Sequence, residues 1–155
     1  MSVCSSAPNM STSSLTVGGR LFVFGVRQWV VCAGVRQPVE SRVMPFYRRY
    51  GIEQALPFLD ELLSFITTTA SRNIAVQRPC GSHLGEDELL LLRGLQALQN
   101  KNLPRTLQLI SGILEPPFRR TYTRLAHSYL SVLEQQSLDL TGLRYLYLTT
   151  VPRVQ

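Results

Sequence analysis

The helical periodicity of this chain is clearest in residues 86–135, which read EDELLLLRGLQALQNKNLPRTLQLISGILEPPFRRTYTRLAHSYLSVLEQ. Apolar residues recur there at intervals of three and four in three successive runs, which is the pattern of amphipathic helices. Asn102 is suited to cap a helix whose first turn holds Pro104, and Pro116 and Pro117 end one run and open the next. Three acids fill the first turn of the first run, where carboxylates favour the positive end of the helix dipole. The stretch therefore predicts three successive helices.

The first two of these helices also resemble a known repeat. Residues 90–117 resemble one tetratricopeptide repeat, which is built from a pair of antiparallel helices. The matching positions are Leu90, Gly94, Ile110, Ile113, Leu114 and Pro117, and the departures are Ala97, where the repeat has Tyr, and Thr106, where it has a small Ala. No second copy follows at the period of about 34 residues that stacked arrays use. The resemblance implies a helical hairpin with the third helix packed alongside.

Three further helices are predicted upstream. The first covers about residues 15–35 and is apolar on most sides, so we expect it to lie centrally in the fold. The second follows Pro38 and ends at Gly51, because glycine readily adopts the left-handed conformation beyond a last helical turn. The third covers about residues 52–70 and bears two apolar stripes. The apolar positions of the second helix are Val43, Phe46, Tyr47 and Tyr50, and the two stripes of the third are Ile52, Leu56, Leu59, Leu63 and Ile66, and Phe58, Leu62 and Phe65.

The length of 155 residues fits one domain. We expect an all-α bundle of five to six helices over residues 15–150, with a disordered tail over residues 1–14 and a short tail over residues 151–155. Residues 71–85 break the helical pattern, and Ile74 and Val76 alternate there as in a short extended piece. Residues 143–148 fit either a helical turn or a strand.

The chain has a net positive charge but few charged residues. Sixteen Lys and Arg residues face ten acids, for a formal net charge of +6, and Lys101 is the one lysine. Such a preference for arginine usually accompanies GC-rich coding sequence and suggests a bacterial source. Charged residues make up 17% of the chain, against roughly 25% in typical soluble domains. Either uncharged polar groups cover the surface, or some apolar surface is kept for a partner.

The cysteines and the most apolar segment indicate the cellular compartment in which the protein works. Cys4, Cys32 and Cys80 are too few and too widely spaced for a disulfide framework, so we expect reduced thiols in a cytoplasmic protein. Arg27 and Gln28 interrupt the apolar run that contains them, so we expect no transmembrane segment. The Ser- and Thr-rich start, which precedes the first acid of the chain, also fits a transit peptide, and that alternative stays open.

The turn that holds Cys80 and His83 is a candidate metal site. A thiolate and an imidazole at this spacing can reach one zinc ion, but a four-coordinate site needs two more ligands. Cys32, His127 or an acid among residues 86–88 could supply them only if the fold brings them near. Zinc at Cys80 and His83 is the one cofactor that the sequence suggests.

The same turn has two other interpretations. Cys80 precedes a helix N-terminus, which favours a nucleophilic thiolate with His83 as its base. The acids that follow oppose this, because negative charge disfavours the thiolate. The simpler alternative is an ordinary turn in which Ser82 caps the next helix and Cys80 packs as a small apolar side chain.

A basic face is predicted on the last long helix. Arg120, Arg124 and His127 lie at positions i, i+4 and i+7, opposite the apolar stripe, and Arg119 flanks them. Such a face suits phosphate groups, nucleic acid or an acidic segment. The alternatives are a solvated face or one that pairs with the acids of residues 86–88. A smaller patch is formed by Arg42, Arg48 and Arg49 beside Tyr47 and Tyr50, and it fits either an anion site or arginines that complement the negative end of a helix.

The sequence holds no recognisable catalytic motif, which favours a non-catalytic protein, and an enzyme whose site assembles from distant residues stays open as an alternative. The leading hypothesis is a non-catalytic helical protein that acts through protein–protein interaction, as an adaptor, a regulator or a small homo-oligomer. Its partner-facing surface would be the apolar side of residues 21–35 or the stripe Phe58, Leu62 and Phe65. The alternatives are nucleic-acid or anion binding by the basic face and metal binding at Cys80 and His83.

Overall fold

A computed structural model describes residues 2–3 and 10–140 of the chain. Its helices are α1 (Val17–Val35), α2 (Glu40–Arg49), α3 (Ala55–Thr69), α4 (Glu86–Gln99), α5 (Leu103–Ile110) and α6 (Pro116–Gln135). Two short strands, β1 (Ser2–Val3) and β2 (Ala75–Val76), pair in parallel, and a short 3-10 helix, η1, covers Thr12–Ser14. The described residues therefore form a predominantly helical bundle, which confirms the predicted all-α fold.

The three helices of the C-terminal half begin where the sequence predicts. α4 starts at Glu86 and α6 at Pro116, and the Asn102 side chain accepts a hydrogen bond from the Arg105 backbone N–H at 3.2 Å. α5 ends earlier than expected, at Ile110. The signals for these starts are local caps and prolines, which act through the backbone of the same segment.

α4 and α5 form the predicted hairpin, with α6 packed against α4. The buried Thr106, at a position where the repeat has alanine, donates a hydrogen bond from its hydroxyl to the Gly94 carbonyl at 3.3 Å. A Cβ added at Gly94 would lie 3.3 Å from the Tyr122 hydroxyl oxygen of α6. Gly94 therefore allows α6 to approach α4 closely.

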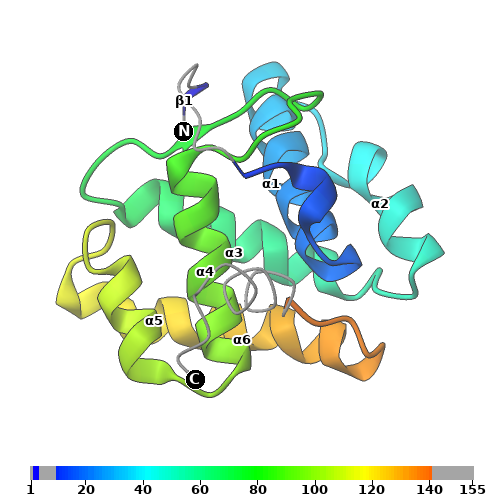
Figure 1. Cartoon of the computed structure of the whole chain (residues 1–155). Helices are drawn as coiled ribbons and strands as arrows, with labels where there is room; N and C mark the ends of the chain where they lie inside the picture. The colour runs from blue at the N-terminus through cyan, green and yellow to red at the C-terminus, as the bar shows by residue number, and fades with distance from the viewer. Residues whose placement is uncertain (1, 4–9, 141–155) are drawn as a thin grey trace.

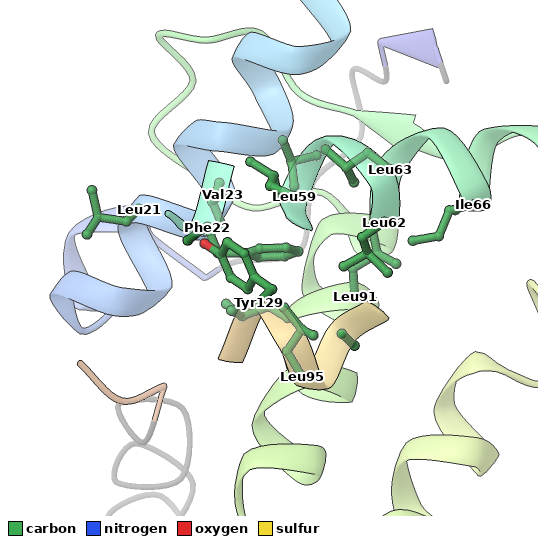
Figure 2. Close-up of a cluster of buried hydrophobic side chains, with 14 of the residues drawn as sticks. Leu21, Phe22, Val23, Leu59, Leu62, Leu63, Ile66, Leu91, Leu95 and Tyr129 are labelled. Carbon is green, nitrogen blue, oxygen red and sulfur yellow. The ribbon is translucent and has the colours of Figure 1, made fainter. Parts of the chain in front are cut away.

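The core lies between α1, α3, α4 and α6. Figure 1 shows α2 at one edge of the molecule and α5 at the opposite edge, with the other four helices between them. Figure 2 shows side chains of all four central helices meeting in one buried cluster, which includes Phe22, Leu59, Leu91 and Tyr129. The expectation of a central first helix holds for its N-terminal part, whereas residues 33–35 are exposed.

α2 is fastened to this core by Tyr47. The Tyr47 hydroxyl lies 2.9 Å from the Tyr129 hydroxyl of α6 and 3.2 Å from the Leu21 carbonyl of α1. Burial raises the pKa of both tyrosines, so both stay protonated at physiological pH. Gly25 of α1 makes room for the Tyr47 side chain, because a Cβ at this position would lie 2.7 Å from its hydroxyl oxygen. Beyond α2, Gly51 has φ 71°, the left-handed conformation expected where this helix stops.

The expected disordered tail over residues 1–14 is structured in its described parts. Besides the strand pairing of β1 with β2, the Thr12 N–H donates to the Ser82 carbonyl at 2.8 Å and the Leu84 N–H donates to the Met10 carbonyl at 2.9 Å. The loop before α4 leaves these backbone groups without partners of its own, and the N-terminal segment satisfies them. The prediction for residues 143–148 and the tail over residues 151–155 lie outside the described residues.

No helix in the described ranges combines the length and the apolar character that a membrane crossing requires.

Candidate binding surfaces

A buried ion pair holds the loop that carries Cys80 and His83. Arg27 of α1 binds both carboxylate oxygens of Glu88 at 2.7 and 3.0 Å, and the two residues are only 3% and 2% exposed. The same guanidinium donates to the Gly81 carbonyl at 2.7 Å and to the His83 carbonyl at 2.9 Å. The loop backbone is therefore tied to both α1 and α4 through one side chain.

This role of Arg27 has no direct signature in the sequence. Arg27 interrupts an apolar run, and Glu88 looks like an ordinary first-turn acid that favours the helix dipole. Glu88 does cap α4, since it accepts the Gly85 N–H at 2.8 Å. A lone arginine on a largely buried helix, with an acid in the first turn of a later helix, is the signal that could have suggested the pair.

The candidate metal ligands gain no partners from the fold. Cys80 and His83 are exposed, and the His83 ring nitrogen Nδ1 lies 3.0 Å from the Ser82 hydroxyl. Cys32 is buried in α1, where burial raises the pKa of its thiol. Within residues 2–3 and 10–140, no group of three or more His, Cys, Asp or Glu side chains could hold a metal ion. Zinc binding at Cys80 and His83 stays a prediction.

The expected cap of α4 is placed differently. Gly85, and not Ser82, is the N-cap residue of α4. The Ser82 carbonyl instead accepts hydrogen bonds from Thr12, through its backbone N–H at 2.8 Å and its hydroxyl at 3.2 Å. Ser82 thus binds the N-terminal segment, and this contact could not be predicted from the periodicity of the sequence.

A second ion pair joins α4 to the segment before it. Arg72 binds both oxygens of Asp87 at 2.9 and 2.8 Å, and the Ala75 N–H donates to the same carboxylate at 2.7 Å. Burial works against ionisation of Asp87, but the hydrogen bonds from Arg72 and Ala75 outweigh it and lower the pKa of Asp87 below its ordinary value. Ionisation of Asp87 therefore strengthens the contacts that hold the strand β2 in place.

We expect the substitution Asp87→Asn to lower the free energy of unfolding by on the order of 1–3 kcal/mol at neutral pH, because the Ala75 N–H and Arg72 lose a charged acceptor. A lowered pKa in the folded state stabilises the fold above the unfolded pKa of about 3.9, and this stabilisation is lost as the pH falls through the folded pKa. The difference between wild type and variant should therefore shrink between neutral pH and about pH 3. Urea unfolding at several pH values measures it, and a difference that does not change with pH would contradict this role.

The predicted basic face of the last helix is present. Arg120, Arg124 and His127 are all exposed on α6, opposite its buried stripe, and these three residues are called the α6 basic face below. Arg119 is half-buried instead, and its Nε donates to the Leu114 carbonyl at 3.1 Å. The ion pairs found among the described residues, Arg27–Glu88 and Arg72–Asp87, do not involve α6. The alternative in which this face pairs with the acids of residues 86–88 is therefore not what the structure shows.

The apolar stripe Phe58, Leu62 and Phe65 does not form an exposed surface. Leu62 is only 1% exposed and lies in the buried cluster of Figure 2, which corrects its assignment as a partner-facing residue. Phe58 and Phe65 are half-buried, and the Phe65 ring meets the Phe118 ring of α6 edge-on at a centroid distance of 6.2 Å. The reason is that α3 is covered by neighbouring helices along both of its apolar stripes.

An exposed surface that mixes arginine with aromatic residues lies on α2 instead. Arg42, Phe46, Arg49 and Tyr50 are exposed at positions i, i+4, i+7 and i+8, and they are called the α2 outer face below. Phe46 is 45% exposed and Tyr50 is 40% exposed. The Phe46 ring rests against the Phe24 ring of α1 at a centroid distance of 4.6 Å. Helical spacing places Phe46 and Tyr50 in one apolar pattern with Val43 and Tyr47. Of these four residues, only Val43 and Tyr47 are buried.

A hollow beside the ends of α4 and α6 has a volume of about 340 Å³. It is lined by Gln99, Asn100, Glu134, Ser137, Leu138 and Asp139. The Gln99 side chain accepts the Leu140 N–H at 2.7 Å and contacts the Leu138 carbonyl at 3.4 Å, so it fastens the chain after α6. Five of its six lining residues have polar or charged side chains, whereas typical small-molecule sites are lined mainly by hydrophobic and aromatic side chains.

The described part of the chain is thus an all-α bundle with two exposed faces that carry arginine. Models of known protein families, curated proteins and solved structures give no match to this chain. Its own surfaces are therefore the guide to its partners.

Proposed function

We propose that this protein has no catalytic role and acts by binding a protein partner through the α2 outer face. The observation that carries the proposal is the pair of exposed aromatic side chains, Phe46 of α2 and its C-cap residue Tyr50, beside the exposed Arg42 and Arg49. Aromatic residues and arginine are the types that contribute most to protein–protein interfaces.

The exposure of these two rings is unusual for this molecule. Among the described residues, the large apolar side chains that stay exposed are Val35, Phe46, Tyr50 and Leu103. Phe46 of α2 and Tyr50, the C-cap residue of the same helix, are four residues apart, whereas Leu103 lies on α5. Burying each ring against a partner would remove apolar area from water, which stabilises the complex by about 25 cal/mol per Å² of buried apolar area.

The face is also held ready for binding. The adjoining side of α2 is fixed by Val43 and Tyr47, which are fully buried, and Phe46 rests on Phe24. A surface that is already ordered loses less conformational freedom when a partner docks.

The charge on this face indicates the chemistry of the partner. Arg42 and Arg49 of this face are both exposed, and the exposed Arg48 lies beside them in the sequence. A symmetric dimer through this face would bring like charges together, which disfavours self-association there. An acidic surface or segment with one or two apolar anchors complements the face, and the role is then that of an adaptor or regulator. Cys32 and Cys80 are free thiols, which supports a reducing, cytoplasmic setting.

The double substitution Phe46→Ser/Tyr50→Ser tests this proposal. Tagged protein is recovered gently from its own cells, and stoichiometric partners are quantified by mass spectrometry. We expect the partner to be captured by the wild type and reduced at least about tenfold by the variant, since loss of one hot-spot residue costs about 2 kcal/mol or more.

The matched control is Leu103→Ser, which removes a similarly exposed apolar side chain from α5. It should leave capture unchanged, and circular dichroism should show the wild-type helix content for both variants. Capture that is equal for the α2 variant and the wild type would overturn the proposal, and so would a wild-type protein that recovers no stoichiometric partner.

A further inference from the structure

The α6 basic face is a separate surface, on a different helix from the proposed protein-binding face. Arg120, Arg124 and His127 lie within an arc of about 60° around the helix, and the rise from the first to the last is about 10.5 Å. The chain has no acid between Glu115 and Glu134, so the solvent-facing side of α6 presents its two exposed arginine cations without an intervening negative charge.

The helix that carries these cations is rigidly placed. Tyr122 and Tyr129 on its opposite side are at most 1% exposed, and Tyr129 is hydrogen bonded to Tyr47. Arg119 is tied back to the Leu114 carbonyl. The three exposed side chains therefore project from a fixed backbone, and a ligand need not order the helix on binding.

The residues around the α6 basic face are polar and have short side chains. Thr123, Ser128 and Ser131 flank it, and each hydroxyl donates to a carbonyl of its own helix, at 2.8, 3.1 and 2.9 Å. The exposed large apolar side chains of the described residues all lie on other helices. The face thus lacks the apolar anchor that a protein interface needs at its centre.

The chemistry of the face therefore favours a ligand that is bound by charge alone. Arginine offers a planar fork of donors that fits phosphate oxygens, and successive phosphates along a nucleic acid strand present a row of such acceptors. The tyrosines of α6 are buried and cannot stack on bases, so the face can position a strand but cannot read its sequence.

We propose that the α6 basic face binds the phosphate backbone of a nucleic acid strand without sequence preference. Arg120 and Arg124 form the principal phosphate contacts, and His127 extends the row by one further position. This site is independent of the partner-binding role of α2.

The test is binding of a fluorescent single-stranded DNA of mixed sequence, about 20 nucleotides long, followed by anisotropy between about 50 and 200 mM salt. Two arginine–phosphate contacts predict a slope of about −1.4 in log K against log salt, since each contact contributes about 0.7 for a single strand. The substitution Arg120→Gln/Arg124→Gln should bring the slope close to zero and weaken binding at the lowest salt by at least about tenfold.

The matched control is Arg42→Gln/Arg49→Gln, which removes the same charge from α2, and it should keep most of the affinity and the slope. An equal loss with both double variants would overturn the proposal, because binding would then follow net charge and not this face. Absence of wild-type binding at low salt would also overturn it. Polyglutamate that displaces the DNA as well as an unlabelled strand does would point to an acidic protein and overturn it too.

Discussion

Replacement of Arg27 by methionine is expected to lower the free energy of unfolding by about 3–5 kcal/mol, the usual cost of leaving one member of a buried ion pair without its partner. Glu88, 2% exposed, would keep a buried carboxylate with no cation beside it. The Gly81 and His83 carbonyls would lose their donor as well. Urea unfolding followed by far-UV circular dichroism measures the change.

The double substitution Arg27→Met/Glu88→Leu separates the two contributions. It removes the isolated charge, so most of the loss should be recovered. A deficit of about 1–3 kcal/mol should remain, because the loop carbonyls and the Gly85 N–H lose their side-chain partners. If the single variant is no less stable than the double variant, the explanation by an uncompensated buried charge is wrong.

The second large effect is expected at Gly25. The substitution Gly25→Ala places a Cβ at 2.6 Å from a methyl carbon of Leu59 and 2.7 Å from the Tyr47 hydroxyl oxygen. Relief requires the buried Leu59 and Tyr47 side chains to shift, or α1 to move away from α2 and α3, and overpacking of this kind costs about 1–3 kcal/mol. The cost should appear as a lower midpoint in both thermal and urea unfolding.

Gly34→Ala is the control for this prediction, since it lies in the same helix and has no heavy atom within 4 Å of an added Cβ. It should stabilise the protein by about 0.5–1 kcal/mol through the better helix propensity of alanine. Adding Tyr47→Phe to the Gly25→Ala variant removes one of the two clashing atoms and should recover part of the loss. Equal stability of the two alanine variants would contradict the close packing at Gly25.

The C-terminal helices could be predicted from the sequence because their signals are local. Asn102 and Pro116 act on the backbone within one turn of their own positions, so their effect does not depend on the rest of the fold. The basic face of α6 follows from the same periodicity, because one turn of helix places Arg120 and Arg124 together.

Features that depend on distant partners could not be predicted in this way. Arg27 meets a glutamate 61 residues away, and only the fold shows that this arginine is satisfied inside the protein. Leu62 and Phe46 each sit on an apolar helical pattern, yet Leu62 is covered and Phe46 is exposed. The pattern gives the apolar sides of a helix, but the number of neighbouring helices decides which sides are covered.

The Tyr47 hydroxyl meets both α1 and α6, so the helix with the aromatic face and the helix with the cationic face share one buried hydrogen-bond network. Movement of either helix relative to the other would break a buried hydrogen bond of the Tyr47 hydroxyl. Two ligands bound at these faces would therefore keep a constant separation and orientation relative to each other. A bundle of this size could thus set the geometry between a protein and a nucleic acid strand without changing its own shape.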